Sequence, residues 1–193
     1  MSKLDEAQKT LDAKSLTQAC ETKELEDGGQ VTKDSELTYC LLILGYAIQD
    51  DLSNAKFVWK RIPKELKKKS KDLPAVWKVV QKLFAKEHIV QFYLSTEGYA
   101  WPPHIQPWVV VLLDTVRARN RSLIAKGYST ISVEQCCNLL GLPKERLAAY
   151  VPKWTIDKGV VHPAAEAVRK DQAVSVRQIT QLTEAVVNLE TLS

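Results

Sequence analysis

Residues 51–63 predict one short helix whose two ends are both marked in the sequence. Asp51 can cap the first turn, because its carboxylate accepts hydrogen bonds from backbone N–H groups that have no partner within the helix. Pro63 disfavours helical geometry at the preceding residue, so the helix should end near position 62. Apolar residues at three- or four-residue spacing share one face of a helix, and here they are Leu52, Ala55, Trp59 and Ile62. We expect this face to lie in the core, so that the segment is one member of a stack of helices.

Similar helical patterns precede and follow this segment. The spacing of apolar residues predicts helices over 3–26, where two short ones fit, and over 36–49, 73–86 and 89–95. Trp77 and Leu83 lie on the apolar face of one of them and are expected in the same core. Short links between helices favour antiparallel neighbours. The sequence therefore predicts a mainly α fold that begins with a short stack of helix pairs, like a tetratricopeptide array, over residues 1–107.

The pattern changes after residue 107. The predicted segments, in chain order, are a long helix over 108–126, a β-prone piece at 129–131, helices that begin at Ser132 and Pro143, and short strands at 160–162 and 167–169. Ser132 and Gln135 form a capping box, and Gly141 ends that helix. The order helix, strand, helix, helix, strand, strand is the plan of a winged helix, which we expect to occupy residues 108–171.

The last segment, 172–193, predicts an amphipathic helix. Its apolar stripe follows helical spacing and consists of Val176, Ile179, Leu182, Val186 and Leu189. The winged helix before it already has all of its elements, so little of its core is left to cover the stripe. We expect the stripe to bind other protein chains, and the alternative is that it folds back on its own domain.

Basic residues gather in one part of the chain. The net charge is +4, and most of the basic surplus lies at residues 60–71. A nucleic-acid surface normally interleaves aromatic residues or arginines with its lysines, and none lies between Lys64 and Lys71. The predicted third helix of the winged helix, the element that reads DNA in such folds, lacks the base-reading residues Asn and Gln. We therefore interpret the lysine run as a solvated surface and expect no nucleic-acid partner.

The sequence contains no pattern that points to catalysis, a cofactor or a small-molecule substrate. Four cysteines and three histidines are present, but no Cys-x-x-Cys pair or His-Glu-x-x-His array offers a metal two ligands on one face. No Ser/His/Asp set or glycine-rich phosphate loop occurs. The longest apolar run, residues 39–48, is far shorter than the roughly 20 residues of a membrane-spanning helix. The N-terminus lacks the apolar centre of a secretory signal, so the cytoplasm and nucleus are the expected locations.

Several segments resemble a known family. The most specific are residues 51–63, which end in Trp-Lys-Arg-Ile-Pro, and the Leu-Thr-Glu at 182–184; the others are 18–26, 77–84, 128–131 and 139–142. Together they make the chain similar, from about residue 15 to residue 192, to the small PCI subunits. This family includes subunit eight of the COP-nine signalosome, which the segments resemble most, a small subunit of the proteasome lid and the k subunit of translation initiation factor three.

The resemblance implies a non-catalytic scaffold subunit of the COP-nine signalosome, the complex that removes Nedd8 from cullins and so regulates cullin-RING ubiquitin ligases. PCI subunits join side by side through the edges of their winged helices, which implies a contact at Val160 and Val161 here. Their C-terminal helices gather into one bundle, and the catalytic zinc belongs to another subunit. The alternatives are a subunit of the initiation factor or the proteasome lid, or a basic winged-helix module that binds nucleic acid.

Overall fold

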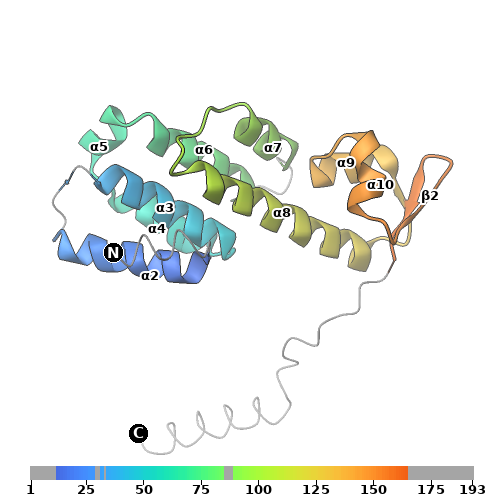
Figure 1. The fold of residues 1–193 in the computed structure, drawn as a ribbon, viewed down its shortest axis with the longest axis horizontal. Coiled ribbons are helices and arrows are strands. Elements are labelled where there is room, and N and C mark those ends of the chain that lie inside the picture. Colours follow the sequence, from blue (N-terminus) through green and yellow to red (C-terminus); the bar gives the residue numbers. More distant parts are fainter. Residues whose placement is uncertain (1–11, 29–30, 33, 85–88, 165–193) are drawn as a thin grey trace, which may run out of the picture.

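The computed structural model describes residues 12–28, 31–32, 34–84 and 89–164. The fold is mainly α-helical with one small sheet, as the sequence predicts. Most of the helices pack together at one end of the molecule, and the sheet lies at the other end (Figure 1). The predicted C-terminal helix, 172–193, and the predicted strand at 167–169 lie outside the described residues. No helix in the described part of the chain is both long and apolar enough to cross a membrane.

The helices of the first part begin and end close to the predicted positions. In chain order they are α2 (Ala13–Glu26), α3 (Ser35–Ile48), α4 (Leu52–Arg61), α5 (Lys64–Lys69), α6 (Asp72–Phe84) and α7 (Ile89–Glu97), followed by the long helix α8 (Gln106–Gly127). Of the two short helices predicted within 3–26, the second corresponds to α2, and the first falls in the segment 1–11, outside the described residues. The lysine run forms the short helix α5, for which the sequence predicts no separate element.

Local caps account for the boundaries of α4. The Asp51 carboxylate accepts a hydrogen bond from the backbone N–H of Asn54 at 3.0 Å. At the other end Ile62 is the C-cap and has an extended ψ of 132°, as expected for a residue that precedes a proline. The cap satisfies a backbone donor that the first turn of a helix leaves without a partner. Both predicted ends of this helix are confirmed.

The first core forms around α3, which is buried along most of its length. Its largest fully buried side chains are Leu41, Leu42, Ile43 and Leu44. Because α2, α4, α6 and α8 all pack against α3, apolar residues are needed on more than one of its faces. α2 comes very close at Gly45, where an added Cβ would lie 2.7 Å from Cγ2 of Thr17. Glycine at this position therefore lets the two helices approach each other.

α8 connects two hydrophobic cores. Its first half contributes Trp108, Leu112 and Val116 to the core around α3, whereas Ile124, near its end, belongs to a second core. Figure 1 shows α8 running from the helical end of the molecule toward the sheet. The division between the cores lies inside this helix, and the domain boundary expected after residue 107 stays a prediction.

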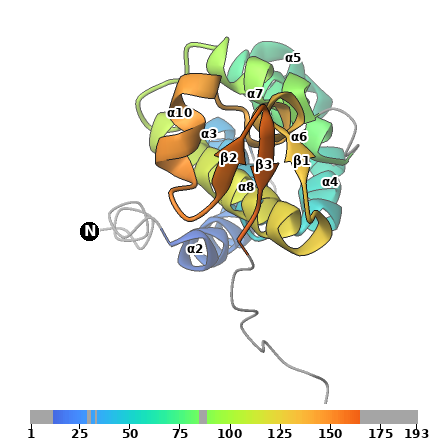
Figure 2. The same ribbon diagram turned by 90° about the vertical axis from the view of Figure 1, so that its right-hand side faces the viewer.

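The second core supports a small antiparallel sheet. The elements of this part of the chain are β1 (Ile131–Ser132), α9 (Val133–Leu140), α10 (Lys144–Tyr150), β2 (Thr155–Asp157) and β3 (Val160–His162). The strand order is β1-β3-β2, and Figure 2 shows the strands side by side. With α8 these elements follow the predicted order helix, strand, helix, helix, strand, strand. β3 is the strand predicted at 160–162, whereas β2 precedes it and was not predicted. The likeness of this part to a winged helix, and of the first part to a tetratricopeptide array, stays a prediction.

Candidate partner interface

Val160 and Val161 lie in the central strand of the described sheet and not at one of its edges, and the partner contact implied for them stays a prediction. They belong to β3, which pairs with β1 through Ile131 and Val161 and with β2 through Ile156 and Val161. Because β3 is paired on both sides, its backbone cannot pair with a further chain. The free edges of the described sheet belong to β1 and β2.

The edge strand β2 is exposed along its whole length, and the sequence prediction missed it. It is joined to β3 by Lys158 and Gly159, whose φ angles of 45° and 83° are both positive. Two such residues form the type I′ turn that is common in short β-hairpins. Gly159 is the one residue whose type indicates a turn at this place. The turn was not recognisable from the sequence, because lysine, its other residue, rarely adopts a positive φ. At this edge Ile156 is 40% exposed.

The helix α9 packs against one face of the sheet. The Ser132 hydroxyl accepts from the backbone N–H of Gln135 at 3.2 Å, and Gly141 ends the helix in a left-handed conformation with a φ of 60°. Both features are as predicted from the sequence. The buried face of α9 and the strands share the second core, in which Ile131 and Val161 are 4% and 0% exposed. The sheet therefore has one face covered.

A polar network joins the end of α9 to the helical stack. The Tyr93 hydroxyl of α7 donates to the Leu139 carbonyl at 3.2 Å, and the Asn120 amide of α8 donates to the same oxygen at 2.8 Å. The Arg117 guanidinium of α8 donates to the Gly141 carbonyl at 3.2 Å. Burial raises the pKa of Tyr93 to about 12, so the phenol keeps its proton. These bonds satisfy carbonyls that the end of a helix leaves free. They also orient the sheet-bearing part, the residues from β1 to β3, relative to α8.

The structure places the predicted core residues at two depths. Ala55 and Ile62 are buried, with exposures of 0% and 2%. The other four are partly buried and pack against the first core: Leu52, Trp59, Trp77 and Leu83. The two tryptophan rings stack, with centroids 5.2 Å apart and planes 5° apart. Trp59 thus packs against the first core, as its place on the apolar face predicts, but it is only partly buried.

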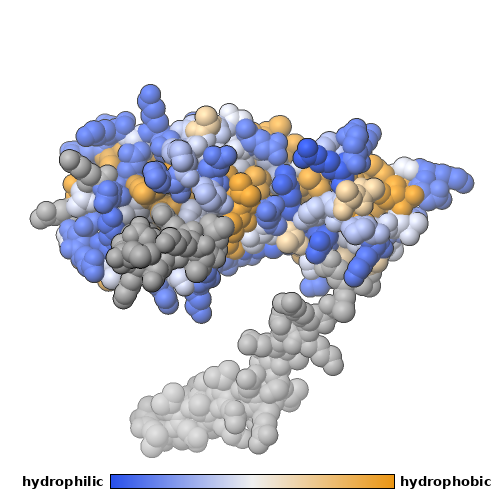
Figure 3. All heavy atoms as spheres, viewed as in Figure 1, coloured by the Kyte–Doolittle hydropathy of each residue, from blue (hydrophilic) through white to orange (hydrophobic). Residues whose placement is uncertain are grey.

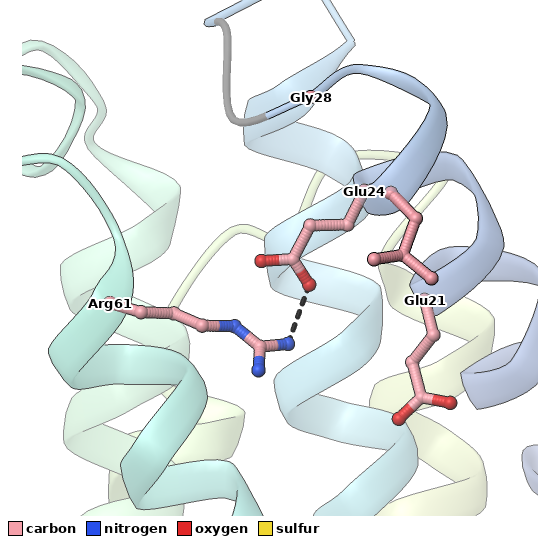
Figure 4. Close-up of a pocket in the computed structure, with 5 residues that line it drawn as sticks. Glu21, Glu24, Gly28 and Arg61 are labelled. Carbon is pink, nitrogen blue, oxygen red and sulfur yellow. Dashed lines mark hydrogen bonds and ion pairs between the residues drawn. The ribbon is translucent and has the colours of Figure 1, made fainter.

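A cleft of about 450 Å³, lined in part by charged side chains, opens between the ends of α2 and α4 (Figure 4). The Arg61 guanidinium donates to the Glu24 carboxylate at 2.5 Å, and the Tyr46 hydroxyl donates to Glu21. Burial, with the neighbouring Glu21 carboxylate, raises the pKa of Tyr46 to about 12. Both carboxylates are thus held by side chains of adjacent helices. These two contacts connect α2 to α3 and to α4.

The described residues contain no group of three or more His, Cys, Asp or Glu that could hold a metal ion. The cysteines are free and buried. Burial raises the pKa of Cys20 to about 12 and that of Cys136 to about 11, so these thiols stay protonated and are poor nucleophiles. Because His88 lies outside the described residues, the absence of metal from the whole chain stays a prediction. So does the role of the stripe at 176–189, which also lies outside them.

Comparison with known proteins identifies relatives along most of the chain. Residues 33–183 match the model of the CSN8/PSMD8/EIF3K family. A protein of Arabidopsis thaliana is 29% identical over 180 residues, which cover 91% of both chains. A protein of Xenopus laevis is 30% identical over 189 residues, or 95% of both chains. A protein of Danio rerio is 32% identical over 135 residues, or 70% of this chain and 69% of its own. Each of the three is named COP9 signalosome complex subunit 8.

Proposed function

The chain belongs to the CSN8/PSMD8/EIF3K family, and from this premise we propose that it is a non-catalytic scaffold subunit of the COP9 signalosome. This complex removes Nedd8 from cullins and so regulates cullin-RING ubiquitin ligases. The observation that carries the proposal is the similarity to relatives named COP9 signalosome complex subunit 8 over 91% and 95% of this chain. The partners are then other signalosome subunits in the cytoplasm and nucleus, rather than a nucleic acid, a membrane or a small molecule.

Two surfaces hold the chain in the complex under this proposal. The first is the apolar stripe of the segment 172–193, whose aliphatic side chains each contribute roughly 1.5–3 kcal/mol when a partner buries them fully. The second is the free edge of the sheet at β2. The β2 edge takes the place of Val160 and Val161, because β3 is paired on both sides. An exposed edge strand can extend into the sheet of a neighbouring subunit through backbone hydrogen bonds.

Deleting residues 173–193 is expected to leave a folded protein that no longer enters the complex. Side chains before residue 165 already build both cores, so the unfolding temperature should stay close to that of the parent. Loss of the stripe should remove most of the co-purification with the other signalosome subunits. The two measurements are thermal unfolding of the truncated chain and the stoichiometry of the subunits that co-purify with it after co-expression.

Charged substitutions in the segment 172–193 provide a matched pair of variants. Replacing Ile179 and Leu182 with Asp buries charge at the proposed contact and should reproduce the effect of the deletion. Replacing Gln181 and Asn188 with Asp puts the same charges on the opposite face of the predicted helix and should leave incorporation unchanged. If the truncated chain unfolds at a much lower temperature, the segment packs within its own chain. Full co-purification after truncation would show that the sheet edge assembles the complex alone.

Ile156→Pro tests the sheet edge separately and is expected to lower incorporation without unfolding the protein. In a hairpin with a two-residue turn, Asp157 and Val160 form the hydrogen-bonded pair next to the turn, so the N–H of Ile156 points away from β3. Proline removes this outward donor and is tolerated on edge strands. The measurements are the co-purification of neighbouring subunits and the unfolding temperature of the variant.

The matched control for this variant is Ile156→Ala, which removes the side chain but keeps the backbone N–H. A larger loss of incorporation for the proline variant than for the alanine variant is expected if the contact is a backbone ladder. Equal losses would assign the contact to the side chain. Wild-type incorporation of the proline variant, with its fold intact, would rule out β2 as the assembly edge.

A further inference from the structure

The helix α5 and the residue that follows its C-cap carry a dense group of lysines. We call this group the lysine surface; it consists of Lys64, Lys67, Lys68, Lys69 and Lys71. Within residues 56–84 there are ten basic and two acidic residues, against a net charge of +4 for the whole chain. The rest of the chain is therefore net acidic, and the positive field of the protein has its source in α4, α5 and α6.

None of the five lysines forms an ion pair with a carboxylate of the described residues. Basic side chains elsewhere do: Lys23 pairs with Asp34, and Arg61 pairs with Glu24. Four of the five lysines are exposed, and Lys67 is partly buried. Like charges packed on a six-residue helix repel one another, and Glu65 is the only acidic residue of α5. The surface is therefore complementary to an external group of negative charges.

An aromatic ladder beneath α5 holds one of these lysines in place. The Lys67 ammonium lies 4.7 Å from the centroid of the Trp59 ring. Trp59 stacks on Trp77, and Trp77 makes an edge contact with Phe84 at 5.9 Å between centroids. Burial against these rings, and then the charge of Lys64, lower the pKa of Lys67. An anion bound beside Lys67 would offset both effects, because it favours the charged ammonium.

The aromatic ladder also indicates which kind of anion the lysine surface suits. Single-stranded nucleic acid binds by stacking its bases on free aromatic faces and by contacts from arginine, but the Trp59 ring already contacts both Trp77 and Lys67. Arg61, the arginine nearest in sequence to this surface, is held by Glu24. Lysine ammonium groups act as separate point charges and suit carboxylates spaced along a peptide. We propose that the lysine surface docks an acidic peptide segment of a partner protein.

The position of this surface separates it from the assembly contacts proposed above. α5 lies at the end of the molecule opposite the sheet (Figure 1), and Figure 3 shows hydrophilic side chains over this end. A docked acidic segment therefore leaves the β2 edge free. The proposal does not depend on membership of the signalosome, and the two can fail independently, because one is tested by co-purification and the other by direct peptide binding.

The test uses the full chain and a fluorescein-labelled decapeptide made of Glu and Asp, followed by fluorescence anisotropy at two salt concentrations. The peptide should bind, and binding should weaken as salt screens the charges. Replacing Lys64, Lys68 and Lys69 with Gln should raise the Kd about tenfold, the order expected for losing three exposed charge contacts. Replacing Lys144, Lys153 and Lys158, three exposed lysines of the sheet-bearing part, with Gln removes the same charge and should change the Kd by less than about twofold.

Two further probes complete the design. The same decapeptide with every acid replaced by its amide should not bind, and an oligothymidylate of equal charge should bind more weakly than the acidic peptide. The proposal is overturned if the acidic peptide does not bind, or if the two triple variants lose affinity equally. It is also overturned if the oligothymidylate binds more tightly than the peptide, because the surface is then a nucleic-acid site. Circular dichroism of both variants checks that each keeps the parental helix content.

Discussion

Trp108→Ala is expected to lower the free energy of unfolding by about 3–5 kcal/mol, the range for deleting a large buried aromatic side chain. Trp108 lies in the first turn of α8 and is only 1% exposed, so it is among the largest side chains that the first core buries completely. The surrounding helices cannot fill the space that the indole leaves, because α8 is held at its other end by the second core. Chemical denaturation of the variant and the parent measures the loss.

Trp59→Ala is the matched control, since it deletes the same side chain at a partly buried position. Its expected loss is about 1–2 kcal/mol, from the stacking contact with Trp77 and the part of the ring that is covered. Because both variants delete the same side chain, the difference between their losses of stability measures the effect of burial. A loss below about 1 kcal/mol for Trp108 would contradict its place in the core, and equal losses for the two variants would contradict the difference in depth.

Gly141→Ala is expected to destabilise the protein by about 2–5 kcal/mol, because strain and overlap act together there. The φ of 60° at Gly141 is costly for any residue with a Cβ, by about 1–2 kcal/mol. An added Cβ would also lie 2.3 Å from Cγ and Cδ2 of Tyr93. That ring is 3% exposed, and its hydroxyl is bonded to the Leu139 carbonyl. Relieving the overlap moves the end of α9 away from α7, which adds roughly 1–3 kcal/mol.

Gly159→Ala separates the two causes. Gly159 has a φ of 83°, but nothing lies within 4 Å of an added Cβ. Only backbone strain should appear there, at about 1–2 kcal/mol. Urea denaturation of both variants gives the comparison. If Gly141→Ala is no more harmful than Gly159→Ala, then Tyr93 moves aside freely and the network at the end of α9 is not rigid.

The ends of the helices were predictable because they depend on neighbouring residues. The Asp51 cap, the stop before Pro63 and the left-handed Gly141 each involve partners within a few positions of the chain. Periodic apolar residues indicated the faces of the helices for the same reason. The mainly α fold and the family resemblance followed from these local patterns, together with segments whose residues are specific to the family.

Residue depth and strand pairing were not predictable from local patterns. Trp59 and Ile62 lie on the same predicted face of α4, yet Ile62 is buried, whereas Trp59 stacks on Trp77 of α6 and is only partly buried. The position of Val161 in the centre of the sheet depends on β2, whose turn residue Lys158 has an unusual φ. A helical pattern gives the direction of a side chain, but the neighbouring elements decide how much of it is covered.

The sequence by itself determined where the helices other than α5 begin and end, which residues point inward and where the lysines gather. Only the tertiary structure decided that β3 is central, that the cores divide within α8 and that Lys67 lies over Trp59. The physical reason is the separation along the chain of the residues that interact. Caps, turns and periodicity arise from interactions between near neighbours, whereas sheet order and the contact between Lys67 and Trp59 depend on how separate helices and strands pack together.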